Sequence, residues 1–304
     1  MVGYILRRIL FSLFALVGVA FITFIAVFAS GDPVALLLPP EANEAQIQEF
    51  RMQMGLDQPL PIQFAVFAGK AVQGDFGRSL RHDLPAMALV LERLPATMLL
   101  AFTAVIFASA IGIPLGILAA AKKGSWIDDI VVTLSTLGLA APTFWIGTML
   151  IVVFAVELRW LPPSGGDSWD RLIMPAATLA LGFIAVLARF TRSGMLDVLS
   201  REYITTARAK GLPARAVMFG HALRNTLIPI VTLLGLEMGQ LLGGAVVTEN
   251  VFAWPGIGRL VVSSVASRDV PLVVASVLVT SALFIVVNLI VDLLYSVINP
   301  MVRQ

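Results

Sequence analysis

Six long apolar segments limit what this chain of 304 residues can fold into. A helix that crosses the hydrocarbon core of a bilayer needs about 20 apolar residues. The segments that have this length, or come close to it, are residues 9–29, 96–121, 130–156, 173–188, 227–247 and 272–291. Only 13% of all residues are charged, which is too few to give a soluble domain a polar surface. The sequence therefore predicts an all-α membrane protein with six transmembrane helices.

Basic residues near the ends of these segments predict the orientation of the chain. Arg7 and Arg8 precede the first segment, whose apolar run exceeds the about 7–15 residues of a secretory signal core, so it is interpreted as a retained helix. With the amino terminus inside, the inner side also holds Lys122, Lys123, Arg303 and the basic residues of 189–224. The short outer loops hold only Arg159, Arg171, Arg259 and Arg268. Both termini are predicted to be cytoplasmic, and this bias explains the basic residues without a nucleic-acid partner.

The first outer connection, residues 30–95, is long enough to have its own structure. Two helices are predicted in it, at 41–54 and 61–73, because Gly55 and Gly74 supply stop signals. We therefore expect one domain at 1–95, made of the first transmembrane helix plus a periplasmic helical insertion, and a five-helix core at 96–304. Arg78 and Arg81 follow the second helix and are candidates for docking an extracytoplasmic binding protein. The alternative is an insertion that only caps the outer mouth.

The connection between the fourth and fifth segments is far longer than the about 2–8 residues usual between bundled helices. A polar helix is predicted there at 201–210, with Ser200 as its amino-terminal cap. Glu202 in the first turn and Arg208 in the last match the helix dipole. Gly211 offers a left-handed exit, and Pro213 prevents the helix from continuing.

This polar helix is interpreted as a docking element for a soluble partner. Tyr203 and Ile204 offer apolar anchors, whereas Ala207 and Ala209 are small enough for close approach. The candidate docking residues are Glu202, Tyr203, Thr205, Thr206, Ala207, Arg208, Ala209, Lys210 and Gly211. The alternative is a helix that lies in the lipid headgroups, for which the apolar face is thin.

The fifth segment carries a carboxylate within a stripe of glycines. Gly235, Gly239 and Gly243 recur every four residues, so another helix can approach closely. Glu237 lies between them, and a charge at mid-membrane costs about 2.5–3.5 kcal/mol unless it faces water or a partner. Two interpretations stay open, a polar group in a translocation pathway and an interhelical contact. The Glu237 carboxylate could also be the proton or ion site of an ion-coupled secondary transporter, which is one function that the sequence leaves open.

Other chemistry finds little support in the sequence. Without cysteine, and with only His82 and His221, the chain offers no set of metal ligands. The predicted helices contain serines but no histidine or lysine, which argues against an intramembrane enzyme. Pro114 and Pro142 are expected to kink the second and third helices, either to line a path or only to shape packing.

At this point the chain resembles the membrane-spanning subunits of ABC importers in the dipeptide, oligopeptide and nickel branch. Their cytoplasmic motif is written Glu-Ala-Ala, three residues, Gly, and a later Ile-x-Leu-Pro. Ala207 and Gly211 match it, Thr205 and Thr206 replace its first two residues, and Pro229 is its closing proline. Further stretches that resemble the branch are 54–59, 74–77, 188–193, 249–256 and 299–300. Residues 157–169 resemble glutathione-importer permeases, whereas Glu237 departs from the uncharged Gln expected in relatives.

The resemblance covers nearly the whole chain and implies a type I ABC importer transmembrane domain in the bacterial inner membrane. It implies a coupling helix around 200–211, and transport of peptides such as dipeptides, oligopeptides or glutathione. The implied partners are a second, non-identical permease as a heterodimer, two ATPase subunits and an extracytoplasmic peptide-binding protein. ATP and Mg would bind to the ATPases, because the only Gly-Lys pair here, Gly69-Lys70, lacks the phosphate-binding pattern. The chain itself is expected to bind no cofactor and to catalyse no reaction.

Overall fold

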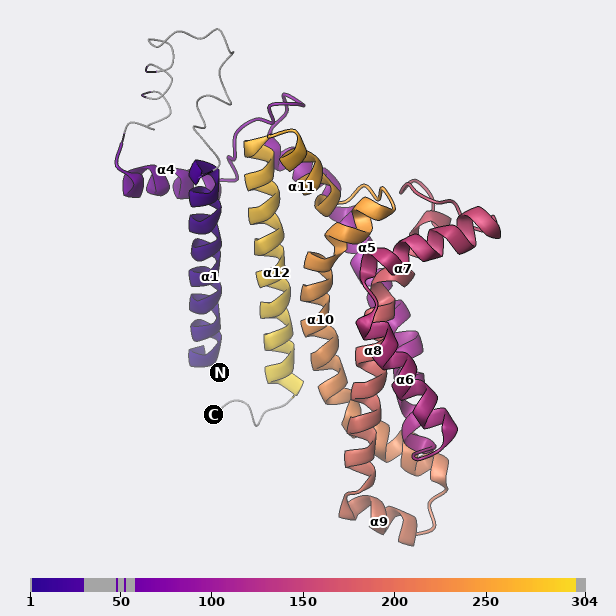
Figure 1. Cartoon of the computed structure of the whole chain (residues 1–304). Helices are drawn as coiled ribbons and strands as arrows, with labels where there is room; N and C mark the ends of the chain where they lie inside the picture. Colours follow the sequence, from indigo (N-terminus) through magenta and orange to yellow (C-terminus); the bar gives the residue numbers. More distant parts are fainter. Residues whose placement is uncertain (1, 30–47, 49–51, 53–57, 299–304) are drawn as a thin grey trace. The chain divides into compact units, whose positions relative to one another are not determined.

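The computed structural model describes residues 2–29, 48, 52 and 58–298, and the regular elements within them are helices (Figure 1). Within these residues, five helices are long and apolar enough to cross a membrane, and a bent pair makes a sixth span if it is counted as one. The elements of these spans are α1 (Val2–Ala29), α5 (Ala86–Ala121), α6 (Trp126–Ala140), α7 (Thr143–Leu150), η1 (Ile151–Glu157), α8 (Asp170–Leu199), η2 (Ala216–Leu223), α10 (Arg224–Val251) and α12 (Val270–Ile298). The predicted all-α class is confirmed.

Helices α5 and α8 extend well beyond their apolar segments. Helix α5 begins at Ala86 rather than at 96, and α8 runs to Leu199 rather than to 188. Charged residues such as Glu92 and Arg192 end the apolar pattern without ending the helix. Hydropathy reports the part of a helix that suits hydrocarbon, whereas backbone hydrogen bonds continue beyond it.

The third span is broken rather than kinked. Helices α6 and α7 meet at an angle of 103°. Ala141 has an extended backbone (φ −77°, ψ 126°), because a residue that precedes proline is disfavoured in the helical conformation. Pro142 then caps the start of α7, where its missing N–H is not needed. Pro114, by contrast, lies inside the continuous helix α5.

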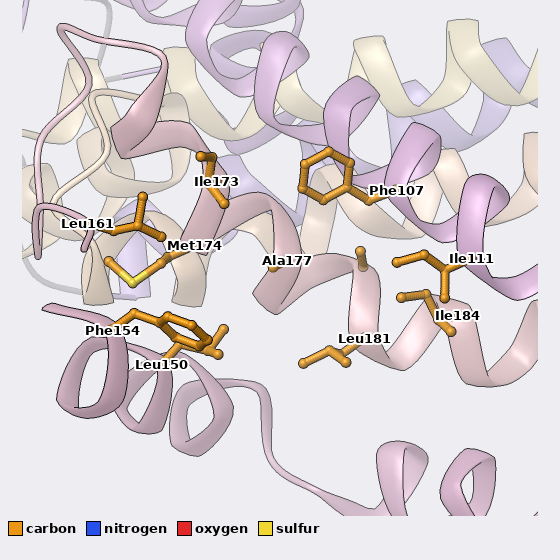
Figure 2. Close-up of a pocket in the computed structure, with 11 residues that line it drawn as sticks. Phe107, Ile111, Leu150, Phe154, Leu161, Ile173, Met174, Ala177, Leu181 and Ile184 are labelled. Carbon is orange, nitrogen blue, oxygen red and sulfur yellow. The ribbon is translucent and has the colours of Figure 1, made fainter. Parts of the chain in front are cut away.

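The chain forms two compact units, and unit 2 comprises residues 96–255 and 287–304. Helix α8 is its centre and packs against α6, α7 and α10. A Cβ added at Gly116 of α5 would lie 2.6 Å from the Ala188 carbonyl oxygen, so glycine permits the close approach of α5 to α8. This unit contains an apolar cavity of about 290 Å³, lined by residues that include Phe107 of α5, Phe154 of η1 and Met174 of α8 (Figure 2).

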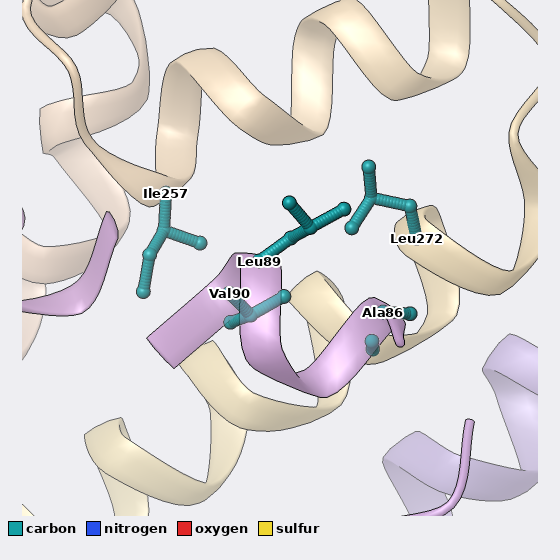
Figure 3. Close-up of a cluster of buried hydrophobic side chains, with 6 residues drawn as sticks. Ala86, Leu89, Val90, Ile257 and Leu272 are labelled. Carbon is teal, nitrogen blue, oxygen red and sulfur yellow. The ribbon is translucent and has the colours of Figure 1, made fainter. Parts of the chain in front are cut away.

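Unit 1 comprises residues 1–95 and 256–286, and therefore holds the beginning of α5, α11 (Ile257–Ala266) and most of α12. Its buried cluster joins Ala86, Leu89 and Val90 of α5 to Ile257 and Leu272 (Figure 3). Helix α11 is a short apolar helix that lies between the fifth and sixth predicted segments and was not predicted.

The insertion agrees with its prediction where the structure describes it. Helix α4 (Leu60–Val72) corresponds to the helix predicted at 61–73, and Gly74 follows with φ 75°. Phe64 of α4 lies against Phe21 of α1, with ring centroids 5.3 Å apart. The helix predicted at 41–54 lies almost wholly outside the described residues, and the domain division at residue 95 stays a prediction.

Candidate coupling helix and pathway pocket

The polar helix predicted in the long connection is α9 (Glu202–Ala209), and its amino-terminal cap differs from the prediction. Arg201 is the cap residue, with an extended backbone (φ −73°, ψ 148°). Ser200 instead ends α8, where its Oγ donates a hydrogen bond of 2.7 Å to the Asp197 carbonyl. The assignment of Ser200 to α9 was wrong because α8 extends eleven residues beyond its apolar segment, from 188 to 199.

The carboxyl-terminal end of α9 is as predicted. Gly211 has φ 78°, the left-handed conformation that glycine adopts without a steric penalty. Its N–H donates to the Arg208 carbonyl at 2.9 Å, and the Leu212 N–H donates to the Ala207 carbonyl at 3.4 Å. This pair of bonds is a Schellman motif, which fixes where the helix stops.

Helix α9 turns its apolar face toward its own chain. Ile204 is fully buried and Ala207 is 7% exposed, and both pack against Val217 of η2. The side chains of Ile204 and Ala207 thus attach α9 to unit 2 and are turned away from its exposed face. The docking role of α9 stays a prediction. The alternative, a helix that lies in the lipid headgroups, is not supported, because the apolar residues of α9 that would enter the lipid are buried against η2.

The exposed face of α9 is polar and partly aromatic. It comprises Glu202, Tyr203, Thr205, Thr206, Arg208, Ala209, Lys210 and the adjoining Gly211. The Tyr203 side chain is 44% exposed, and its hydroxyl oxygen accepts a hydrogen bond of 3.1 Å from Asn225 Nδ2. Tyr203 is thus held in place while part of its ring stays accessible.

Positive charge gathers beside this face. Figure 1 shows the loop between α5 and α6 at the same end of unit 2 as α9, and that loop carries the exposed Lys122 and Lys123. Arg201 pairs with Asp197 at 2.8 Å, and this carboxylate raises the pKa of the Arg201 guanidinium. The surface suits a partner that offers carboxylates.

A buried ion pair that sequence reasoning missed connects α6 to α8 near this surface. Asp128, in the first turn of α6, accepts hydrogen bonds from Arg192 Nε and from Arg192 Nη2, the second at 2.7 Å. The Asp128 side chain is 4% exposed and also accepts the Gly124 N–H at 3.0 Å. The pair therefore holds the α5–α6 loop and α6 against α8. The only sequence signal was an acidic residue just before a predicted span.

Glu237 lines a cavity of about 230 Å³ between α6, α7, α8 and α10. The lining residues on α10 are Glu237, Gln240 and Leu241. Among the described residues, Glu237 has no hydrogen-bond or ion-pair partner. The carboxylate therefore faces an opening in unit 2.

The glycines beside Glu237 have different surroundings. A Cβ at Gly235 would collide with Val291 of α12, so Gly235 lies at a close helix contact. Gly239 is buried, whereas a Cβ at Gly243 would have nothing within 4 Å. Among the described residues, the stripe does not form one continuous contact.

The candidate docking arginines lie in a loop of unit 1. Arg78 pairs with Asp83 at 3.0 Å, with both side chains mostly exposed. The loop is fixed by Asp269, which is 1% exposed and accepts hydrogen bonds from Ser79 Oγ and from the Arg81 N–H. In the part of the chain that the structure describes, no three His, Cys, Asp or Glu residues form a metal site.

Unit 2 thus combines a membrane span broken at Pro142, an exposed polar helix at one end and a cavity lined by a carboxylate. Residues 112–304 match the family "Binding-protein-dependent transport system inner membrane component", and residues 1–101 match "Binding-prot-dependent transport system membrane comp, N-term". The chain belongs to this family. It is a multi-pass inner-membrane permease subunit of a binding-protein-dependent ABC importer and is not itself an enzyme.

Relatives match over the full length. The chain is 44% identical, over 304 residues, to the glutathione transport system permease protein GsiC of Escherichia coli and to that of Salmonella typhi, covering 100% of this chain and 99% of each relative. An inward-facing MetNI methionine ABC transporter has the same fold, with a TM-score of 0.59 and 19% identity over 70% of this chain and 97% of its own. The structure of an amino acid ABC transporter matches with a TM-score of 0.50 and 20% sequence identity, over 69% of this chain and 92% of its own.

Family membership decides between the functions left open by the sequence. An ATPase and a binding protein are partners of such a system, so energy comes from another polypeptide. The alternative function, an ion-coupled transporter that uses Glu237, is therefore rejected in favour of an ATP-driven importer.

Proposed function

We propose that this permease carries peptides, either short oligopeptides or glutathione-like molecules, across the inner membrane. The observation that carries the proposal is the 44% identity to glutathione permeases over the whole chain. The proposed assembly has a second, non-identical permease, two ATPase subunits that bind ATP and Mg, and an extracytoplasmic peptide-binding protein. Arg78 and Arg81 are proposed to contact that binding protein.

We also propose that the exposed face of α9 docks into an ATPase subunit and follows its movement. Three features support this role. The helix is fixed at its end by the Gly211 motif and along its buried face by Ile204. Its exposed residues are polar, and the Asp128–Arg192 pair joins neighbouring helices at the same end of unit 2. A stiff element of this kind transmits a rigid-body movement rather than absorbing it.

Transport by the reconstituted assembly tests the cargo. The chain, its partner permease, the ATPases and the binding protein are placed in proteoliposomes, and ATP-driven uptake of glutathione and of di- and tripeptides is measured. We expect saturable uptake of at least one of these peptides. Uptake confined to sugars, metal ions or free amino acids would contradict the proposal.

Substitution of Gly211 tests the coupling role. In Gly211→Val the new side chain has open space but an unfavourable φ, which costs about 1–2 kcal/mol and shifts the end of α9. We expect transport and cargo-stimulated ATP hydrolysis to fall together while membrane insertion persists. Gly220→Ala is the matched control, because Gly220 also has open space but no positive φ. Normal coupling in Gly211→Val would refute the role of α9.

A further inference from the structure

The cavity beside Glu237 differs in chemistry from the apolar cavity of Figure 2. Among the described residues, those that line the cavity of Figure 2 are all apolar and offer nothing to a charged group. The Glu237 cavity has Glu237 and Gln240 from α10, Thr143 from the beginning of α7, and Thr178 from α8, whose hydroxyl donates to the Met174 carbonyl. Polar residues thus line it from three helices that are far apart in the sequence.

The carboxyl-terminal end of α6, just before the break, lines the same cavity. Gly138, Leu139 and Ala141, at the end of α6, are among its lining residues. Pro142 has no N–H with which to satisfy the Gly138 carbonyl. Carbonyls at the end of a helix carry partial negative charge, which adds to that of the Glu237 carboxylate. The cavity therefore favours a cation that donates hydrogen bonds.

The kind of cation follows from the number of ligands and the size of the cavity. Calcium takes about 6–8 oxygen ligands, usually with several carboxylates, whereas Glu237 is the single carboxylate among the lining residues that the structure describes. An ammonium group has three donors and needs only a few acceptors. At about 230 Å³ the cavity is smaller than the roughly 300–1,000 Å³ of pockets that enclose a whole ligand. It fits one end of a peptide.

We infer that the cavity binds the amino-terminal ammonium group of the peptide cargo during its passage, with Glu237 as counter-ion and with Gln240 and Thr143 as hydrogen-bond partners. This inference rests on the proposed peptide cargo and names the part of the cargo that the permease recognises. Glu237 then selects cargo independently of the binding protein. The site has only one charge, so the cargo can leave it again, as transport requires.

The test compares peptides with free and with acetylated amino termini in the complete importer. Glutathione and N-acetylglutathione are supplied to proteoliposomes that contain the wild type or Glu237→Gln. We expect Glu237→Gln to raise KM for glutathione about tenfold, the loss typical of one hydrogen bond to a charged group, while KM for the acetylated peptide stays constant. Any preference of the binding protein for one of the two peptides cancels from the comparison of wild type with Glu237→Gln, because both permeases are tested with the same binding protein.

A second measurement removes the binding protein altogether. The importer without it, in nanodiscs, is titrated with each peptide, and we expect the wild type to bind glutathione at least about tenfold more tightly than the acetylated form. Glu237→Gln should abolish that difference. Glu157→Gln, an exposed carboxylate at the end of η1 and outside the cavity, should preserve it.

The outcomes separate this inference from the proposed function. Equal effects of Glu237→Gln on both peptides would overturn the inference and indicate that Glu237 pairs with a basic residue of a neighbouring subunit. Unchanged uptake of both peptides would also overturn it, yet leave peptide transport standing. Absence of any peptide uptake by the wild type would overturn the proposed cargo and this inference together.

Discussion

Two buried aspartates stabilise the two units by different means. In unit 2, Asp128 binds Arg192 through two hydrogen bonds and also accepts a backbone N–H. In unit 1, Asp269 accepts hydrogen bonds from Ser79 Oγ and from the Leu272 N–H at 3.3 Å. Both carboxylates join a loop to the first turn of a helix, but only Asp128 has a charged partner within the described residues.

The two aspartates differ in how much stability is lost when one of their partners is removed. A buried charge pair is costly to break from one side, because the remaining charge is left without compensation. The hydrogen bonds that uncharged donors make to the Asp269 carboxylate contribute less, because no second charge is left behind when one donor is removed. The end of unit 2 that carries α9 is therefore fixed more firmly than the Arg78 loop, as suits a surface that must transmit force.

The largest effect is expected from Arg192→Ala. It leaves Asp128 nearly buried without its cation, and we expect a loss of about 3 kcal/mol, the low end for a buried pair because Arg192 is 26% exposed. The measurement is unfolding of the purified protein in detergent. Arg201→Ala is the matched control, because it breaks an exposed pair with Asp197 and should cost less than about 1 kcal/mol. Equal losses for both variants would show that Asp128–Arg192 is an ordinary surface pair.

An intermediate effect is expected at Asp269, where the substitutions themselves sharpen the comparison. Asp269→Ala removes the acceptor of the Ser79 hydroxyl and of the Leu272 N–H, and we expect a loss of about 2 kcal/mol in the same unfolding measurement. Asp269→Asn keeps an amide oxygen for the neutral donors and should recover much of this loss. At position 128, by contrast, Asn should restore little of the stability that Asp128→Ala loses, because Arg192 keeps its charge and has no carboxylate to pair with. If asparagine were tolerated equally at 128 and 269, the contrast between the two units would be wrong.

The apolar spans and the exit of α9 could be predicted from sequence because both depend on local patterns. Runs of apolar residues located the spans, and Gly211 followed by Pro213 marked where α9 ends. The beginning of α9 could not be predicted in the same way. Ser200 has the side chain of a cap, but α8 reaches it first, and the length of α8 depends on packing rather than on hydropathy.

The Asp128–Arg192 pair and the Glu237 cavity lay beyond local patterns for another reason. Asp128 and Arg192 are 64 residues apart, and nothing in either neighbourhood specifies the other. Glu237 was recognised as unusual from its position in an apolar span. Its surroundings, however, depend on the break at Pro142, which the sequence predicted only as a kink.

The smallest effect on stability, and the one that best separates structure from function, is expected from Arg78→Ala. Arg78 forms an exposed pair with Asp83, so its loss should cost about 0.5 kcal/mol or less. If this loop contacts the binding protein, the concentration of binding protein that half-stimulates ATP hydrolysis should nevertheless rise about threefold and depend more weakly on salt. Arg81→Ala, in the same loop, should act alike. A destabilisation as large as that of Asp269→Ala would instead assign Arg78 to the packing of unit 1, and the basic loop would then be a cap rather than a docking surface.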